Sequence, residues 1–391
     1  MIADMIGDIF NSKTEHKYSF SEWTKESAKE STLYGYFSEF VLFVAQRVKE
    51  QHSATDGWRL ILPSELSDFK PLDSNTSRRL DVSLFLGDIH DDVAASNVSD
   101  YADMFAIVEV KRGNRFGDTV NALSQLFVYS TDIYRTQLNR RFLWGLTICA
   151  TDVCAEVIVH DKVLVSSIMD VRTAEGRKQL VSLLVHWSAC STERLGYDPS
   201  IRRREPEEGS QAVDGQRGVD KIRYDIDCYD DVTKEVRTYK TIRTILEAGC
   251  LFGRHTRTII ARPANCDNAD TSDGSAQEVV IKDAWARYNA DEDGARNEIG
   301  LLRTVRETFG TRKLDFIYPK LEVGGTVQVE RDDVCIVDTT AAILDTLDAD
   351  VREALNIPFR AHQHIANTPA SHHAVTRAKR VPSHINKHKA V

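Results

Sequence analysis

The chain has 391 residues, is 42% hydrophobic and 28% charged, and carries a formal net charge of −9. This is an ordinary globular balance with room for two or three domains. The acidic excess excludes a protein that attracts nucleic acid over its whole surface, so nucleic-acid binding would have to be local.

The cysteines and the apolar runs bear on where the protein resides. The seven cysteines are scattered and include no CxxC pair, which is typical of reduced thiols in an intracellular protein, either cytoplasmic or nuclear. The N-terminus has acids where a secretory signal has bases. The longest strand-like apolar run, 142–150, is too short to cross a bilayer, so we expect no membrane association.

The first half is predicted to be a mixed α/β layer domain. Apolar residues at helical spacing predict helices, and alternating or β-rich runs predict strands. In chain order, these patterns predict a helix at 31–51, strands at 57–63, 78–88 and 104–112, a helix at 118–135, strands at 140–150 and 154–160, and a helix at 178–189. Helix, three strands, helix and two strands form a mixed layer fold.

Composition divides the chain into four regions. Residues 1–200 form the α/β domain, and the charged, Gly-rich stretch 201–222 is predicted to be a flexible linker. Residues 223–358 form a second, β-rich domain. The segment 359–391 is basic, rich in His and without apolar periodicity, so we expect a disordered tail.

The strand 104–112 ends in two charged residues that share one face. Glu109 and Lys111 lie two positions apart, and residues i and i+2 of a strand point the same way. Asp81 starts the preceding predicted strand, so a hairpin would bring it to Glu109. Two carboxylates form a hard-oxygen site for Mg²⁺, and a lysine beside them can stabilise charge on a phosphate. The structural alternative is an ion pair on a strand face.

Asp81 followed by Glu109-Val110-Lys111 after an apolar strand resembles the PD-(D/E)xK nuclease superfamily. The resemblance implies a restriction-endonuclease-like fold of helix, three strands, helix and strand. It also implies that Asp81 and Glu109 ligate a metal and that Lys111 assists the nucleophile. Glu39 on the first helix and Gln125 on the second stand where that superfamily often places a further acid and a polar helper.

The second half has a lysine on a strand and a glutamate on a following helix. Strands are predicted at 221–231 and 236–249, and a Gly-containing turn follows within 249–263. Backbone N–H groups of such a turn can contact phosphates. Lys282 ends the β-rich run 278–282, and Glu298 lies on the predicted helix 291–310. A surface ion pair between these two residues is the structural alternative.

LFGRHTRTIIA, VVIKDAWA and NEIGLL together resemble the fungal-type protein kinase family. Upstream, RRLDVSL, the VEVK strand, RRFLWGLTIC and LGYDPSI match marks that this family also carries. The resemblance implies a β-rich, kinase-like N-lobe that uses ATP and Mg²⁺. In it Gly253 and Thr256 belong to the phosphate loop, Lys282 is the ATP lysine and Glu298 is its partner. His255 takes the place of a family glycine, where we expect it to crowd the phosphates.

The family function would be ATP-dependent phosphorylation of Ser and Thr in a protein substrate. No His-Arg-Asp catalytic loop and no Asp-Phe-Gly-like motif follow Glu298. We therefore expect a partial, inactive or truncated kinase-like domain. Two alternatives stay open, namely a Mg²⁺-dependent nuclease acting through Asp81, Glu109 and Lys111, and a non-catalytic interaction protein.

Overall fold

The computed structural model describes most of the first half of the chain and the strands of the second half. The longer described stretches are 29–52, 57–65, 78–94, 101–160, 162–204, 222–230, 232–246, 255–265 and 278–284. The shorter ones are 7, 23, 68–69, 303–305, 307–308, 328–331, 334–337 and 359–362. No helix within these stretches is long and apolar enough to cross a membrane.

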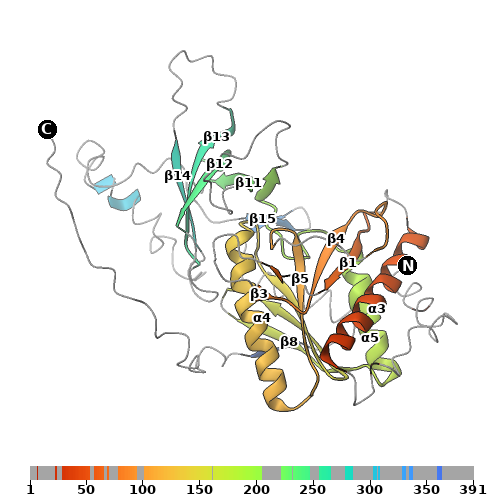
Figure 1. The fold of residues 1–391 in the computed structure, drawn as a ribbon. Helices are drawn as coiled ribbons and strands as arrows, with labels where there is room; N and C mark the ends of the chain where they lie inside the picture. Colours follow the sequence, from red (N-terminus) through yellow and green to blue (C-terminus); the bar gives the residue numbers. More distant parts are fainter. Residues whose placement is uncertain are drawn as a thin grey trace.

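An eight-stranded sheet forms the centre of the first half (Figure 1), with the strand order β1-β4-β5-β6-β7-β8-β17 and with β9 paired to β7. Its strands are β1 (Leu60–Glu65), β4 (Val82–Gly87), β5 (Met104–Lys111), β6 (Leu143–Cys149), β7 (Asp152–Ile158), β8 (Val163–Ser166), β9 (Met169–Asp170) and β17 (Phe359–His362). Strands β5 and β6 are parallel, and the other neighbours are antiparallel. The parallel pair needs a crossover, which helix α4 (Phe116–Thr136) supplies.

Three helices cover the two faces of this sheet. Helices α3 (Glu30–Gln51) and α5 (Ala174–Ala189) pack on one face, where Phe37 and Leu183 share a core with Val108. Helix α4 covers the other face, where Leu126 packs with Ile107. The period-2 alternation of β5 therefore supplies both cores. The three predicted helices of this half are confirmed, and so is the mixed α and β character of the fold.

The second half contains a five-stranded sheet in which every neighbouring pair is antiparallel. Its strands are β10 (Ile201–Arg204), β11 (Arg223–Tyr229), β12 (Val236–Leu246), β13 (Arg257–Pro263) and β14 (Val279–Asp283). The core of this sheet is small: Tyr224, Ile226 and Ile259 pack together with Leu138, which belongs to the first half. Two short hairpins, β2 (Asp68–Phe69) with β3 (Arg78–Arg79) and β15 (Gln328–Arg331) with β16 (Val334–Val337), complete the described elements.

Two predicted region boundaries were wrong. Residues 201–204, expected to open the linker 201–222, form β10, and Ile201 is buried in the core of the second sheet. Residues 359–362, expected to begin a disordered tail, form β17 and pair antiparallel with β8. Both segments were predicted to be irregular because they are charged, and each strand is too short to show a clear apolar alternation. Residues 205–221 and 363–391 lie outside the described part of the chain.

A buried arginine joins two segments that the sequence analysis singled out, 140–150 and 195–201. Arg140 is 1% exposed and donates to the carbonyl oxygens of Met104 (2.6 Å) and Leu195 (3.0 Å). Its guanidinium also lies 3.7 Å from the ring centre of Tyr197 and donates to the Tyr197 hydroxyl at 2.7 Å. Gly196 has a φ of +100°, and a Cβ there would lie 2.2 Å from the backbone oxygen of Phe142. The glycine is therefore required for close backbone approach.

Candidate functional site

The hairpin of β4 and β5 brings Asp81 to Glu109, as predicted. Val82 pairs with Val108, so the next position of the register places Asp81 opposite Glu109. Asp81 Oδ2 accepts a hydrogen bond from the backbone N–H of Val110 at 2.8 Å. This bond fixes the Asp81 carboxylate at the end of β5, where the strand turns from buried to partly exposed residues.

Glu109 and Lys111 form an ion pair on the same side of β5. Glu109 is 1% exposed. Burial raises the pKa of Glu109 to about 8, and the charge of Asp81 acts in the same direction. Burial lowers the pKa of Lys111, but the hydrogen bond and charge of Glu109 outweigh this effect, so the net shift is upward. The two groups therefore titrate as a coupled pair, in which burial favours the neutral form of Glu109 and the Glu109 carboxylate favours the cationic form of Lys111.

Helix α3 contributes two residues that the sequence analysis did not identify, Tyr34 and Glu30. The Tyr34 hydroxyl donates to Glu30 Oε1 at 3.0 Å. Burial raises the pKa of Tyr34, and a hydrogen bond with Asp81 and the Asp81 charge add to the increase. Glu39, expected from the resemblance to provide the helix acid, is exposed instead. Glu30 and Glu39 are nine residues apart, about two and a half turns, so they face opposite sides of the helix.

A second buried acid continues this polar row across the sheet. Thr147 on β6 pairs with Glu109 on β5, and its hydroxyl donates to Glu156 Oε1 at 2.7 Å. Glu156 is fully buried, and burial raises its pKa to about 8. Its carboxylate occupies space beside Gly145, where a Cβ would lie 3.5 Å from Glu156 Oε2. The predictions from sequence missed this residue, because its strand carries two acids, Asp152 and Glu156, and no local pattern marks Glu156 as the buried one.

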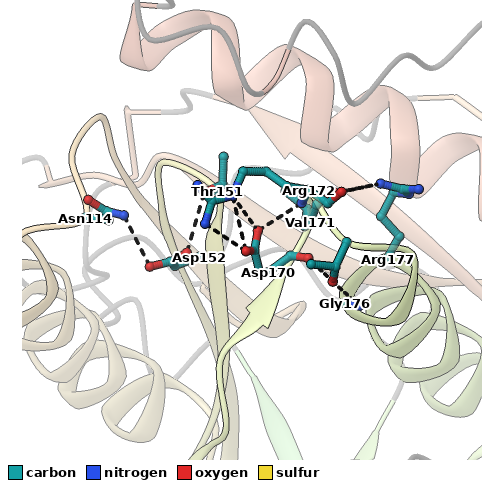
Figure 2. A network of polar contacts seen from close by, with 9 residues as sticks. Asn114, Thr151, Asp152, Asp170, Val171, Arg172, Gly176 and Arg177 are labelled. Carbon is teal, nitrogen blue, oxygen red and sulfur yellow. Dashed lines mark hydrogen bonds and ion pairs between the residues drawn. The ribbon is translucent and has the colours of Figure 1, made fainter.

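The segment after Lys111 is attached to the rest of the domain by a polar network (Figure 2). Asn114 Nδ2 donates to Asp152 Oδ2 at 3.4 Å, and Val171 N donates to Thr151 O at 3.0 Å. Arg172 makes a two-pronged contact with Asp170, at 2.9 Å from Nε and 2.8 Å from Nη2. The network therefore links the end of β5, the β6–β7 hairpin and the start of α5.

The donor set near Glu109 offers two carboxylates to a metal ion. Within the described stretches, no group of three or more His, Cys, Asp or Glu side chains is arranged to hold a metal. Mg²⁺ is commonly bound through one or two carboxylates with water completing the shell. Asp81 and Glu109 meet this smaller requirement. Glu109 Oε2 is buried and has no hydrogen-bond partner among the residues that the structure describes, so a cation would satisfy it. Gln125, the expected polar helper, is exposed on α4.

In the second half, Lys282 lies on β14 opposite Thr258 on β13. Burial alternates along β14: Ile281 packs on the core, while Val280 and Lys282 are on the exposed face, with Val280 64% exposed. Thr256 is half-buried, directly before β13. The predicted phosphate-loop residue Gly253 and the predicted partner Glu298 lie outside the described residues, so their roles stay predictions.

The His255 ring packs against residues of the first half. Its backbone has a φ of +40°, in the left-handed region that glycine favours, and its side chain is buried. The ring lies 4.3 Å from the ring centre of His160 and 5.5 Å from that of Tyr134. Both partners belong to the first half. The expectation that His255 crowds the phosphates stays a prediction, because the preceding residues 247–254 lie outside the described part of the chain.

The fold and these sites define a mixed α+β protein in which a strand lysine follows a Gly-containing connection, as in a kinase-like N-lobe. A family model for fungal protein kinases matches residues 79–374. This match covers most of the chain, and the chain belongs to the fungal protein kinase family. No curated protein and no solved structure matches it.

Proposed function

We propose that the second half of this chain is a nucleotide-binding, kinase-like lobe. The observation that carries the proposal is the position of Lys282, beside Thr258 of β13 on the exposed face of an antiparallel sheet. Exposed Val280 on the same face offers an apolar surface to a base. Membership of the fungal protein kinase family supports ATP as the nucleotide.

Each residue has a defined part in this proposal. Lys282 binds the α and β phosphates of ATP, and Glu298 orients the lysine. Gly253 and Thr256 contribute the phosphate loop. Mg²⁺, when bound, neutralises charge on the phosphates. These residues bind and position the nucleotide, so we propose nucleotide binding as their function and assign no phosphorylation of protein Ser or Thr to them alone.

Thermal unfolding with and without Mg·ATP tests this function. At 100 times the dissociation constant, a ligand stabilises the folded state by about 2.7 kcal/mol. We expect such stabilisation in the wild type and its loss in Lys282→Ala. Lys178→Ala is the matched control, because Lys178 is an exposed lysine on α5. Equal responses of the wild type and Lys282→Ala would refute nucleotide binding at Lys282.

A second candidate is metal-dependent cleavage of a phosphodiester at Asp81, Glu109 and Lys111. It is favoured by the gathering of these side chains at one end of the β4–β5 hairpin. Counting only strands of the large sheet, the first half runs α3, then β1, β4 and β5, then α4 and β6. This is the order of helix, three strands, helix and strand that the PD-(D/E)xK resemblance implies. Asp81 and Glu109 would hold Mg²⁺, which activates water, and Lys111 would stabilise charge on the phosphate.

Incubation with DNA in Mg²⁺ or Mn²⁺ tests this second candidate. We expect cleavage that disappears in Glu109→Ala and persists in Glu39→Ala, a change at an exposed acid on α3. Cleavage that survives Glu109→Ala would refute this site. Silence in both the nucleotide and the cleavage assays would favour a non-catalytic interaction protein.

A further inference from the structure

Three aromatic rings connect the second half to the first. His255 precedes β13 at the end of the connection that includes the predicted phosphate-loop residues. His255 is 3% exposed, and its ring packs against the ring of His160 with the centres 4.3 Å apart and the planes tilted by 30°. The centre of the His160 ring lies 4.4 Å from that of Tyr134. Tyr134 is fixed in turn, because its hydroxyl donates to Ile158 O at 2.7 Å. The His255 ring therefore rests on a rigid part of the first half.

The surrounding contacts extend this attachment. Leu138 of the first half packs in the core of the second sheet with Ile259 of β13. The Tyr224 hydroxyl lies 3.5 Å from Thr136 O at the end of α4. The start of β13 is therefore held between its own sheet and the first half. A left-handed backbone at a non-glycine residue is unfavourable in isolation and persists where its surroundings hold it.

We infer that Tyr134 and His160 are positioning residues for nucleotide binding. They hold His255, and through it the adjacent Thr256, in the conformation that the phosphates meet. This inference rests on the proposed nucleotide-binding function. A loop fixed before binding loses less conformational freedom when the ligand arrives, so its affinity is higher. Residues of the first half thereby control a site on the second half without touching the nucleotide.

The affinity of the full chain for Mg·ATP tests this inference. We expect His160→Ala to weaken binding about three- to tenfold, the loss that one or two newly mobile side chains cause. His255→Ala should weaken Mg·ATP binding by a similar factor. The double variant should bind no more weakly than either single variant, because all three variants remove the same contact between the His160 and His255 rings. His160→Phe, which keeps a ring, should bind like the wild type. His90→Ala, at an exposed histidine of the first half, is the matched control.

Hydrogen exchange without nucleotide separates this inference from the proposed function. Peptides covering 255–263 should exchange faster in His160→Ala than in the wild type or His160→Phe. If the wild type fails to bind Mg·ATP while this exchange difference appears, the proposed function fails and the positioning contact stands. If exchange and affinity are the same in His160→Ala and the wild type, with both proteins folded, the inference is overturned. Additive losses in the double variant would also overturn it, because they would mean independent effects.

Discussion

Replacing Arg140 by alanine should remove a large part of the stability of the chain. The side chain is fully buried, and its removal leaves the side-chain oxygen of Gln137 and the carbonyl oxygen of Leu195 without their Arg140 donor, while Met104 O keeps the donor Gln137 Nε2 at 2.8 Å. Each buried acceptor left unsatisfied costs about 1–3 kcal/mol. The lost contact with the Tyr197 ring adds about 2 kcal/mol, since it is desolvated. The expected loss is about 4–8 kcal/mol, against a total stability of about 5–15 kcal/mol for a typical protein.

Urea unfolding followed by tryptophan fluorescence measures this effect, because Trp144 and Trp187 are buried in the core of the same half. Arg202→Ala is the control: Arg202 also makes a two-pronged contact, with Asp227, but its side chain is 51% exposed. An exposed pair of this kind contributes about 0–1 kcal/mol. If Arg140→Ala and Arg202→Ala shift the urea midpoint equally, the reasoning from burial and unpaired carbonyl groups is refuted.

Three further results are expected. Folded Glu156 holds a proton up to about pH 8, whereas a free glutamate releases it near 4.5, so stability falls as pH rises through this window. Glu156→Gln should remove the part of this fall that Glu156 causes and leave the part that Glu109 causes. By urea unfolding it should be more stable than the wild type at pH 8.5 but not at pH 4.5; parallel pH profiles would contradict this. Mn²⁺ at the Asp81–Glu109 site must displace the Glu109 proton, because the pKa of Glu109 is raised to about 8. The increase in melting temperature caused by Mn²⁺ should therefore grow from pH 6 to pH 9 and be absent in Glu109→Gln. A pH-independent increase in melting temperature would count against the site. Gly196→Ala should cost about 2 kcal/mol or more from its backbone strain and close contact, whereas Gly117→Ala, with open space around it, should be nearly neutral in melting temperature; equal melting points would contradict the strain argument.

The part of the site that local pattern determines could be predicted from the sequence. Side chains alternate along a strand, so Glu109 and Lys111 had to share a side. The antiparallel pairing of two strands consecutive in the large sheet brought Asp81 opposite Glu109. Strand and helix positions in the first half followed from the same periodicities. These features depend on neighbours in the chain or on the nearest strand, which is the range over which a sequence pattern carries information.

The rest depends on how elements pack, which no local pattern records. The apolar pattern of α3 predicted a helix but not which of its acids lies near the Asp81–Glu109 pair. In the structure Glu30 accepts a hydrogen bond from Tyr34 on that side, whereas Glu39 is exposed. The pattern of β7 did not reveal that Glu156 points into a buried row with Thr147. From the sequence, His255 could be compared only with the glycine that the family has at this position. The position of its ring is set by the ring of His160, about a hundred residues earlier in the chain.

The contacts between the two halves argue that the second sheet is not an independent folding unit. Its core combines residues from β10, β11 and β13 with Leu138, a residue of the first half. Arg203 on β10 also forms an ion pair with Asp103, which directly precedes β5. Separating the halves would expose this small core and remove the contact between the His255 and His160 rings. Nucleotide binding should therefore be measured on the whole chain. The family match supports the same view, because it begins at residue 79, inside the first half, and runs through both sheets.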